Sequence, residues 1–289
     1  MIPFFIKLLA RLPLWFLYLI SDLLFVVVYY GKLYRKKVVL DNLYIAFPEK
    51  TQKEREKIAR AFYRNFCDFI IETVKSFHIS KEEVMKRTRP IGNTLQIAET
   101  LAKNKQSIIA LVTHHFSWEW VSMACSAELE TVVSPVYKQL ANKEIDKLIY
   151  QMRSQFGAVP LEMKVSNKEI IKPKDISTAY ILVADQTPAG HNAQYWTTFF
   201  GKEVPFFVGV ARLAPQANLP VYFVRITKPK RGHYLYSLEP VTKPPYKIDE
   251  KGTDFSILDE YSKIIEDAVR KSPENWLWTH KRWKRAKKN

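Results

Sequence analysis

The sequence is poor in the residues that mark several protein classes. Its 289 residues include only two cysteines, Cys67 and Cys125, which lack the spacing of metal ligands and form no secreted disulfide framework. A reducing compartment is therefore expected. Only 8 glycines are present, with no low-complexity tract and no repeat of fixed period. Repeat architectures and biased, unfolded chains are excluded on these grounds.

Acidic residues are also scarce. There are 29 Asp and Glu against 45 Lys and Arg, a formal net charge of +16. Such a chain attracts polyanions, which leaves three partner classes: nucleic acid, an anionic membrane face, or an acidic carrier protein. Hydrophobic residues make up 47% of the chain and aromatic residues 13%, enough to build a sizeable folded core.

An apolar segment stands near the amino terminus. Residues 14–30 are apolar apart from Ser21 and Asp22, at the short end of the about 17–25 residues that span a bilayer. The following GKLYRKK is no signal-peptide cleavage site. An uncleaved anchor or an in-plane membrane helix is favoured, with the basic side chains of 32–37 at anionic headgroups. The alternative is a hydrophobic helix packed on a soluble core.

Strand-like and helix-like patterns alternate after residue 95. Short apolar runs predict strands at 107–113, 131–137, 179–185 and 220–226, and amphipathic patterns predict helices at 95–102, 118–127, 143–156, 208–216 and 254–271. This alternation predicts an α/β fold with a largely parallel central sheet flanked by helices. Sites in such sheets lie at the carboxyl ends of the strands.

One such strand end carries a histidine close to a carboxylate. The run THHFSWEW follows the strand at 107–113 and places His114 five residues before Glu119. An imidazole beside a carboxylate can deprotonate a hydroxyl, because the carboxylate fixes the tautomer and stabilises the imidazolium. A lone histidine among aromatic residues is more often a packing residue, so this spacing alone is a weak signal.

Four motifs that follow one another along the chain make the functional prediction more specific. HHFSWEW, ADQTPAG, QYWTTFFGKEVPFFVG and ENWLWTHKRWKR resemble the late lipid A (lauroyl/myristoyl) acyltransferase family of lipopolysaccharide biosynthesis. The resemblance extends from YRKKVVLDNLYIAFPEK almost to the carboxyl end.

The resemblance implies an acyltransferase that moves an acyl chain from acyl carrier protein to a hydroxyacyl chain of a lipid A precursor or similar glycolipid. His114 matches the catalytic base and Glu119 its partner. No cofactor or metal is expected, since the thioester donor already activates the carbonyl. The resemblance also implies residues 1–31 as a membrane anchor, with residues 32–289 as the acyltransferase domain on the cytoplasmic face of the inner membrane.

The sequence departs from the family at one place. Phe116-Ser117 stands where the family usually has a Gly-Asn step, which leaves open how the acceptor meets the histidine. His115 is a neighbouring alternative base, one residue closer to Glu119.

Four further residues are candidates for substrate binding. Arg153 matches a position where the family often carries arginine, and its guanidinium could bind a lipid phosphate or stabilise an oxyanion. Lys138, after a strand, is a weaker candidate of the same kind. Asp185 and Gln186 follow the strand at 179–185, where they could shape the acceptor pocket or tie down a loop; for Asp185 a structural role is favoured over that of a second catalytic acid.

Two aromatic regions allow more than one interpretation. Residues 195–207 could line an acyl-chain groove, lie at a lipid interface or form core. In the basic carboxyl-terminal segment, Trp276, Trp278 and Trp283 could anchor the chain at an interface, or the segment could be a solvated tail.

Three alternatives to lipid A acylation stay open. A related enzyme could acylate another membrane lipid or glycolipid. A basic protein binding single-stranded nucleic acid is compatible with the charge and aromatics, but no nucleic-acid-binding motif is present, so no nucleic-acid partner is expected. A non-catalytic membrane scaffold is supported only by Phe116-Ser117.

Overall fold

The computed structural model describes residues 2–31, 33–188 and 194–287. A seven-stranded sheet has the order β1-β9-β8-β2-β5-β3-β4, in which every neighbouring pair is parallel except β8 and β9. The strands are β1 (Thr88–Pro90), β2 (Ile108–Val112), β3 (Val132–Tyr137), β4 (Leu161–Glu162), β5 (Thr178–Val183), β8 (Val221–Lys230) and β9 (His233–Thr242). The predicted α/β fold with a largely parallel sheet is confirmed.

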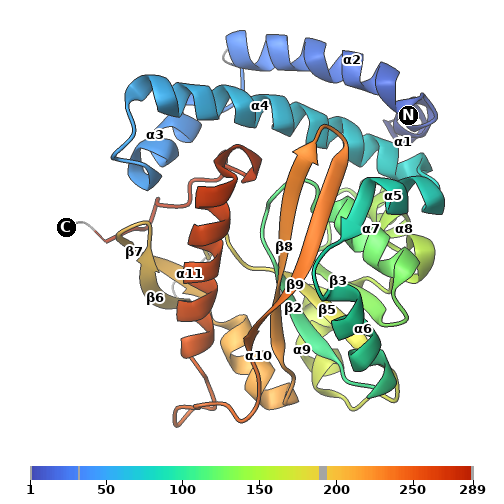
Figure 1. Cartoon of the computed structure of the whole chain (residues 1–289), viewed down its shortest axis with the longest axis vertical. Helices are drawn as coiled ribbons and strands as arrows, with labels where there is room; N and C mark the ends of the chain where they lie inside the picture. The colour runs from blue at the N-terminus through green and yellow to red at the C-terminus, as the bar shows by residue number, and fades with distance from the viewer. Residues whose placement is uncertain (1, 32, 189–193, 288–289) are drawn as a thin grey trace.

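Helices cover both faces of this sheet (Figure 1). From residue 36 onward the helices are α3 (Lys36–Ala46), α4 (Gln52–Lys75), α5 (Lys81–Arg87), α6 (Thr94–Lys103), α7 (Trp118–Glu128), α8 (Lys143–Arg153), α9 (Met163–Ile171), α10 (Gly209–Ala217) and α11 (Ser256–Lys271), with 3-10 turns η2 (Ser76–His78), η3 (Gln155–Gly157) and η4 (Pro273–Asn275). A capping box formed by Thr51 and Glu54 begins α4.

The central strand β2 contributes side chains to a hydrophobic core on each face of the sheet. All five of its residues are buried. Ile109 and Leu111 pack in the core cluster that includes α10 and α11, whereas Ile108, Ala110 and Val112 pack in the cluster that includes α5 and α7. A strand buried on both faces needs a continuous apolar run, and SIIALV provides one.

A separate antiparallel hairpin lies beside α11. Its strands are β6 (Gln194–Phe199) and β7 (Lys202–Phe207). Phe199 and Phe206 are fully buried and contact each other, and Phe199 also contacts the buried Trp276 and Trp283. Of the three interpretations of residues 195–207, core therefore holds for this part of the stretch. The interfacial role expected of the carboxyl-terminal tryptophans is wrong, because Trp276, Trp278 and Trp283 are all buried.

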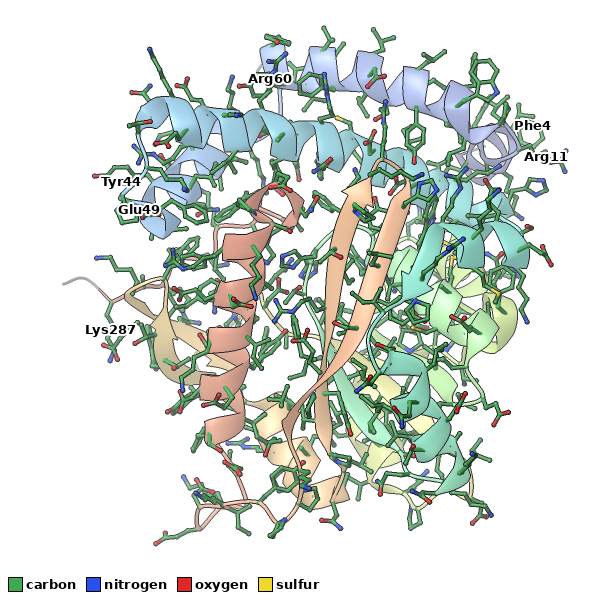
Figure 2. All side chains as sticks on the ribbon, in the orientation of Figure 1. Phe4, Arg11, Tyr44, Glu49, Arg60 and Lys287 are labelled. Carbon is green, nitrogen blue, oxygen red and sulfur yellow. The ribbon has the colours of Figure 1, made fainter. Side chains whose placement is uncertain are left out.

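The amino-terminal segment forms two helices and a π-helical turn. These are α1 (Ile2–Ala10), α2 (Leu14–Phe25) and η1 (Val26–Tyr30). Within the described residues, none of the helices alone has the length and hydropathy to cross a bilayer, and only the pair 4–10 and 14–30, bent by 117°, meets that criterion together. Leu17 and Phe25 are buried inside the molecule, while Trp15, Leu19 and Leu23 are exposed; Figure 2 shows the side chains on the outer side of α2 pointing away from α4.

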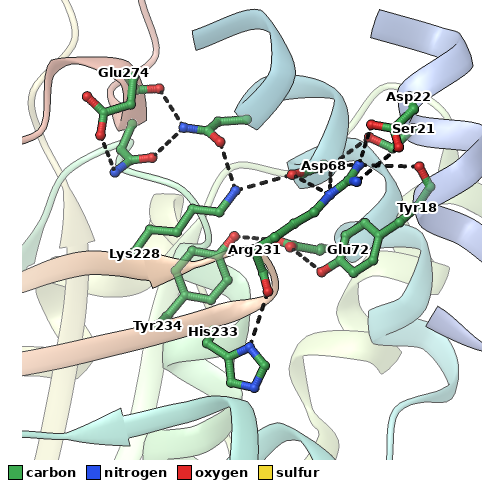
Figure 3. A network of polar contacts seen from close by, with 12 residues as sticks. Tyr18, Ser21, Asp22, Asp68, Glu72, Lys228, Arg231, His233, Tyr234 and Glu274 are labelled. Atoms are coloured by element: carbon green, nitrogen blue, oxygen red, sulfur yellow. Dashed lines mark hydrogen bonds and ion pairs between the residues drawn. The ribbon is translucent and has the colours of Figure 1, made fainter. Parts of the chain in front are cut away.

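A polar network fastens α2 to α4 and to the tip of the β8–β9 hairpin (Figure 3). Arg231 at this tip binds Asp22 of α2 at 2.9 Å and Asp68 of α4 at 2.6 Å. The Ser21 hydroxyl donates to Asp68 at 2.8 Å. The two polar residues that interrupt the apolar segment therefore hold one face of α2 on the protein.

Candidate active site

The register of two parallel strands places the predicted histidine beside a carboxylate. Val112 at the end of β2 pairs with Val183 at the end of β5. Because the strands are parallel and in register, His114 and Asp185 each stand two residues beyond a paired position. Both emerge at the carboxyl edge of the sheet, where sites in α/β folds lie.

His114 has a partner at each ring nitrogen. Its Nδ1 lies 2.6 Å from Oδ1 of Asp185, and its backbone N–H donates to Oδ2 of the same carboxylate at 3.0 Å. A carboxylate can only accept, so Nδ1 carries a proton, and in the neutral ring Nε2 then holds the lone pair. The side-chain amide of Gln186 lies 3.1 Å from Nε2. The arrangement gives a ring of fixed tautomer with a basic nitrogen on its outer side.

Asp185 is buried and fully hydrogen-bonded. Besides the two contacts with His114, its Oδ2 accepts the indole N–H of Trp276 at 2.7 Å. Burial alone would raise its pKa, but the charge and hydrogen bonds of His114, with the Trp276 bond, hold the pKa of Asp185 well below its ordinary value. Asp185 is therefore an anion in the folded protein.

Glu119 has a different partner from the one expected. Its carboxylate accepts from Arg153 at 2.5 and 3.1 Å and from the Trp118 indole at 3.3 Å. Burial lowers the pKa of Arg153, but the Glu119 charge and hydrogen bonds outweigh this and raise it overall. The first turn of α7 directs Glu119 toward the last turn of α8. The expected pairing is corrected: Asp185 occupies the place at Nδ1 of His114, while a catalytic contribution of Glu119 stays a prediction.

His115 is a buried packing residue. Its side chain is 2% exposed, and its Nδ1 lies 2.5 Å from the Thr113 hydroxyl. Burial lowers the pKa of His115 to about 4. The neutral ring points into the protein, which removes it from a site open to a lipid hydroxyl.

The unusual Phe116-Ser117 step lies on the core side of the site. The peptide bond between these residues is cis. Phe116 is 1% exposed and stacks on Phe69 at 5.1 Å and on Phe62 at 5.9 Å. The large side chain therefore packs against α4 as part of the core.

A narrow apolar cavity of about 70 Å³ lies beside the Glu119–Arg153 pair. Its walls come from β2, β3, β5, β8 and α7, and include Val136, Ile181 and Val224. Trp118 lines it as well and contacts the His114 ring edge-on at 5.2 Å between centroids. Apolar walls with a few polar groups are typical of ligand pockets, which usually measure about 300 Å³ or more, so this cavity must widen to hold a whole acyl chain.

The remaining predicted residues are only partly brought together. Gln186 contacts His114 directly. Arg153 is linked to it only indirectly, because it binds Glu119, which accepts from the Trp118 indole beside His114. Lys138 lies exposed beyond β3, and none of the described contacts joins it to His114. Ala189 and Gly190 of the ADQTPAG motif lie outside the described residues. The motif that contains Trp276 was recognised from the sequence, but the hydrogen bond from its indole N–H to Asp185 was not predicted. A buried indole donor leaves no separate signal in the sequence.

Comparison with known proteins identifies a family. The family model described as "Bacterial lipid A biosynthesis acyltransferase" matches residues 2–285. The chain is 25% identical to "Lipid A biosynthesis acyltransferase 2" of Shigella flexneri, over 90% of this chain and 81% of the relative. It is 23% identical to "Lipid A biosynthesis lauroyltransferase" of Escherichia coli (strain K12), over 86% of this chain and 79% of the relative.

Proposed function

Since the chain belongs to the bacterial lipid A biosynthesis acyltransferase family, we propose that this acyltransferase uses His114 to move a fatty acyl group from acyl carrier protein to a hydroxyacyl chain of a lipid A precursor. The observation that carries the proposal is the contact between His114 and Asp185 at an open sheet edge. It leaves a basic nitrogen available beside an apolar cavity.

His114 acts as the general base. The acceptor hydroxyl replaces the Gln186 amide at Nε2 and gives up its proton there as its oxygen attacks the thioester carbonyl. This attack forms the ester carbon–oxygen bond and gives a tetrahedral intermediate. When the intermediate collapses, the carbonyl double bond forms again, the carbon–sulfur bond breaks, and the proton passes from Nε2 to the departing thiolate. A general base of this kind contributes about 10² to 10⁴ in rate.

Asp185 makes this proton transfer favourable. Its carboxylate holds the proton on Nδ1, so that Nε2 always faces the acceptor as a base. When Nε2 takes the proton, the buried anion stabilises the resulting imidazolium. Trp276 and the His114 backbone fix the carboxylate from two further directions. This account assigns Asp185 the tautomer-fixing role that the sequence suggested for Glu119.

The Glu119–Arg153 pair is proposed to act at the wall of the cavity. Glu119 orients Arg153, whose guanidinium stands where a phosphate of the acceptor or the developing oxyanion would need a positive charge. The apolar cavity beside them is proposed to receive the donor acyl chain. Loss of Glu119 therefore affects the reaction through Arg153 and not through the histidine.

The amino-terminal helices are proposed to hold the enzyme at the cytoplasmic face of the inner membrane. Phe4, Trp15, Leu19 and Leu23 are more than half exposed, and amphipathic helices with such a face lie in the membrane interface. The net charge of +16 suits both anionic lipid and an acidic carrier protein.

The direct test is an assay with purified enzyme, acyl-loaded carrier protein and a lipid A precursor in mixed vesicles. Wild-type protein should produce a precursor heavier by one acyl chain, as measured by mass spectrometry, and His114→Ala should not. A wild-type enzyme that acylates a different membrane lipid and leaves the precursor untouched would move the proposal to that acceptor.

A further inference from the structure

A second apolar space lies on the outside of the molecule, away from the cavity beside Arg153. It is a groove of about 270 Å³ between α1, α4 and α8. Figure 1 shows α1, α8 and one end of α4 on the same side of the molecule. Its walls include Ile6, Phe69, Val74, Phe77, Ile145 and Ile149. A single water needs only about 10–15 Å³, so this space is far larger than a packing defect.

The groove walls present no polar surface. Ile145, Leu148 and Ile149 line it from one stripe of α8, at the spacing of a helix face. The one hydroxyl in the wall belongs to Thr73, and it donates to the Phe69 carbonyl of its own helix at 2.8 Å. Water entering this groove would find no hydrogen-bond partner, so an apolar occupant is favoured over solvent.

At one end the groove joins the exposed apolar face of α1. Ile6 forms part of its wall, and the neighbouring side chains of Phe5 and Leu8 are 57% and 52% exposed. If α1 and α2 lie in a membrane interface, the groove opens directly into the lipid layer. A hydrocarbon chain could then enter it without crossing water.

Toward the sheet edge the groove leads to the histidine. Phe69 in its wall contacts Trp118 with ring centroids 4.4 Å apart, and Trp118 contacts His114 at 5.2 Å. Trp118 also lines the cavity beside Arg153 but is not part of the groove wall. One indole thus stands between two apolar spaces, next to the proposed base.

We propose that the groove between α1, α4 and α8 binds one acyl chain of the membrane-resident acceptor, while the cavity beyond Trp118 takes the chain being transferred. The inference rests on the proposed acyltransferase reaction and adds the route by which the acceptor arrives. A lipid that keeps one chain in the groove can bring a hydroxyl on a neighbouring chain to Nε2 of His114 without leaving the bilayer.

The test fills the groove from two opposite walls. Ile149→Trp obstructs it from α8 and Val74→Phe from α4, and Tyr150→Trp places the same indole at the adjacent, exposed position of α8. Initial rates are measured with carrier-bound donor and with a hydroxyacyl glycolipid in vesicles, together with vesicle binding, thermal unfolding and sedimentation velocity.

Both groove variants should raise the KM for the glycolipid about tenfold, equal to about 1.4 kcal/mol, and leave the KM for the donor and vesicle binding unchanged. Tyr150→Trp should match wild type.

Three results would overturn the inference. The first is an unchanged glycolipid KM in both groove variants, although wild-type enzyme acylates it. The second is a raised KM for the donor alone, which would place the donor chain in the groove. The third is a change of oligomeric state in the groove variants, which would make the groove an interface between copies. Failure of wild-type enzyme to acylate any lipid would instead contradict the proposed function, so the two failures are distinguishable.

Discussion

The Nδ1 atom of His114 and the Oδ1 atom of Asp185 lie 2.6 Å apart, although 71 residues separate them in the chain. The second oxygen of the carboxylate accepts from the His114 backbone and from the Trp276 indole. Every hydrogen bond to this carboxylate favours its ionised form. The pair is thus a preformed unit in which the aspartate determines which ring nitrogen is basic.

Asp185→Asn should lower kcat for acyl transfer by about 10²-fold or more, because an amide can stabilise the wrong tautomer and carries no charge to offset the imidazolium. The KM for both substrates should change little. Steady-state kinetics at saturating donor and acceptor provide the measurement. Full kcat in this variant, with a large loss in Glu119→Gln, would return the partner role to Glu119.

His114→Ala should abolish transfer while the protein still folds and binds membranes. His115→Ala should lose much less activity, because that ring is buried, has a pKa of about 4 and points away from the acceptor side. Its main effect should be on stability, at about 1–3 kcal/mol for the cavity and the unpaired Thr113 hydroxyl. Equal loss of activity in the two variants would refute the assignment of the base.

Glu119→Ala should lose most of the rate and also destabilise the fold. It leaves the half-buried Arg153 guanidinium without its partner, which should cost about 2 kcal/mol. Replacing both residues in Glu119→Leu/Arg153→Met should recover part of that stability but none of the rate. Urea unfolding and kinetics on the two single variants and the double variant measure both effects; additive losses of stability would show that the pair does not interact.

Because of Glu72, the free energy of unfolding should fall as the pH rises. It is fully buried, and burial raises its pKa from 4.5 to about 7, against the opposing effects of Lys228 and Tyr234. Between these pH values the folded protein binds a proton that the unfolded chain has released, so the free energy of unfolding decreases by about 3 kcal/mol across the window.

Glu72→Gln cannot ionise and should flatten this dependence between pH 5 and 8 in urea-unfolding experiments. The exposed Glu99→Gln serves as the matched control and should retain the slope of the wild type. An unchanged slope in Glu72→Gln would show that other groups cause the pH dependence.

Much of the fold could be predicted because its signals are local. β2 and β5 are apolar runs of strand length, and the helices between strands have clear amphipathic stripes, so the alternation that defines the fold class was readable. The polar runs after β2 and β5 could also be recognised as strand ends. What remained hidden was which strand ends meet.

The pairing of His114 depends on strand order, which is a tertiary property. β5 lies next to β2, although β3 follows β2 in the chain. A guess based on chain order would have favoured Lys138 after β3 as the neighbour of His114, and the structure leaves Lys138 exposed. Spacing within one motif suggested Glu119, but the helical turn that follows carries it toward Arg153.

The carboxyl-terminal tryptophans show a second kind of ambiguity. Aromatic residues mixed with basic ones suit a membrane interface, but they also suit a core in which cations pack on rings. Arg282 lies 4.3 Å from the centroid of Phe206 and is fully buried, and cation–π contacts of this kind can hold a guanidinium among aromatic rings. Composition alone does not separate these two environments.

The central claim is acylation of lipid A through His114, and mass spectrometry of lipid A from the source bacterium tests it most directly. The gene is deleted and then restored as wild type or as His114→Ala. Deletion should remove one secondary acyl chain, and only the wild-type gene should restore it, with the mass difference giving the chain length. Unchanged lipid A after deletion, or full restoration by His114→Ala, would contradict the account.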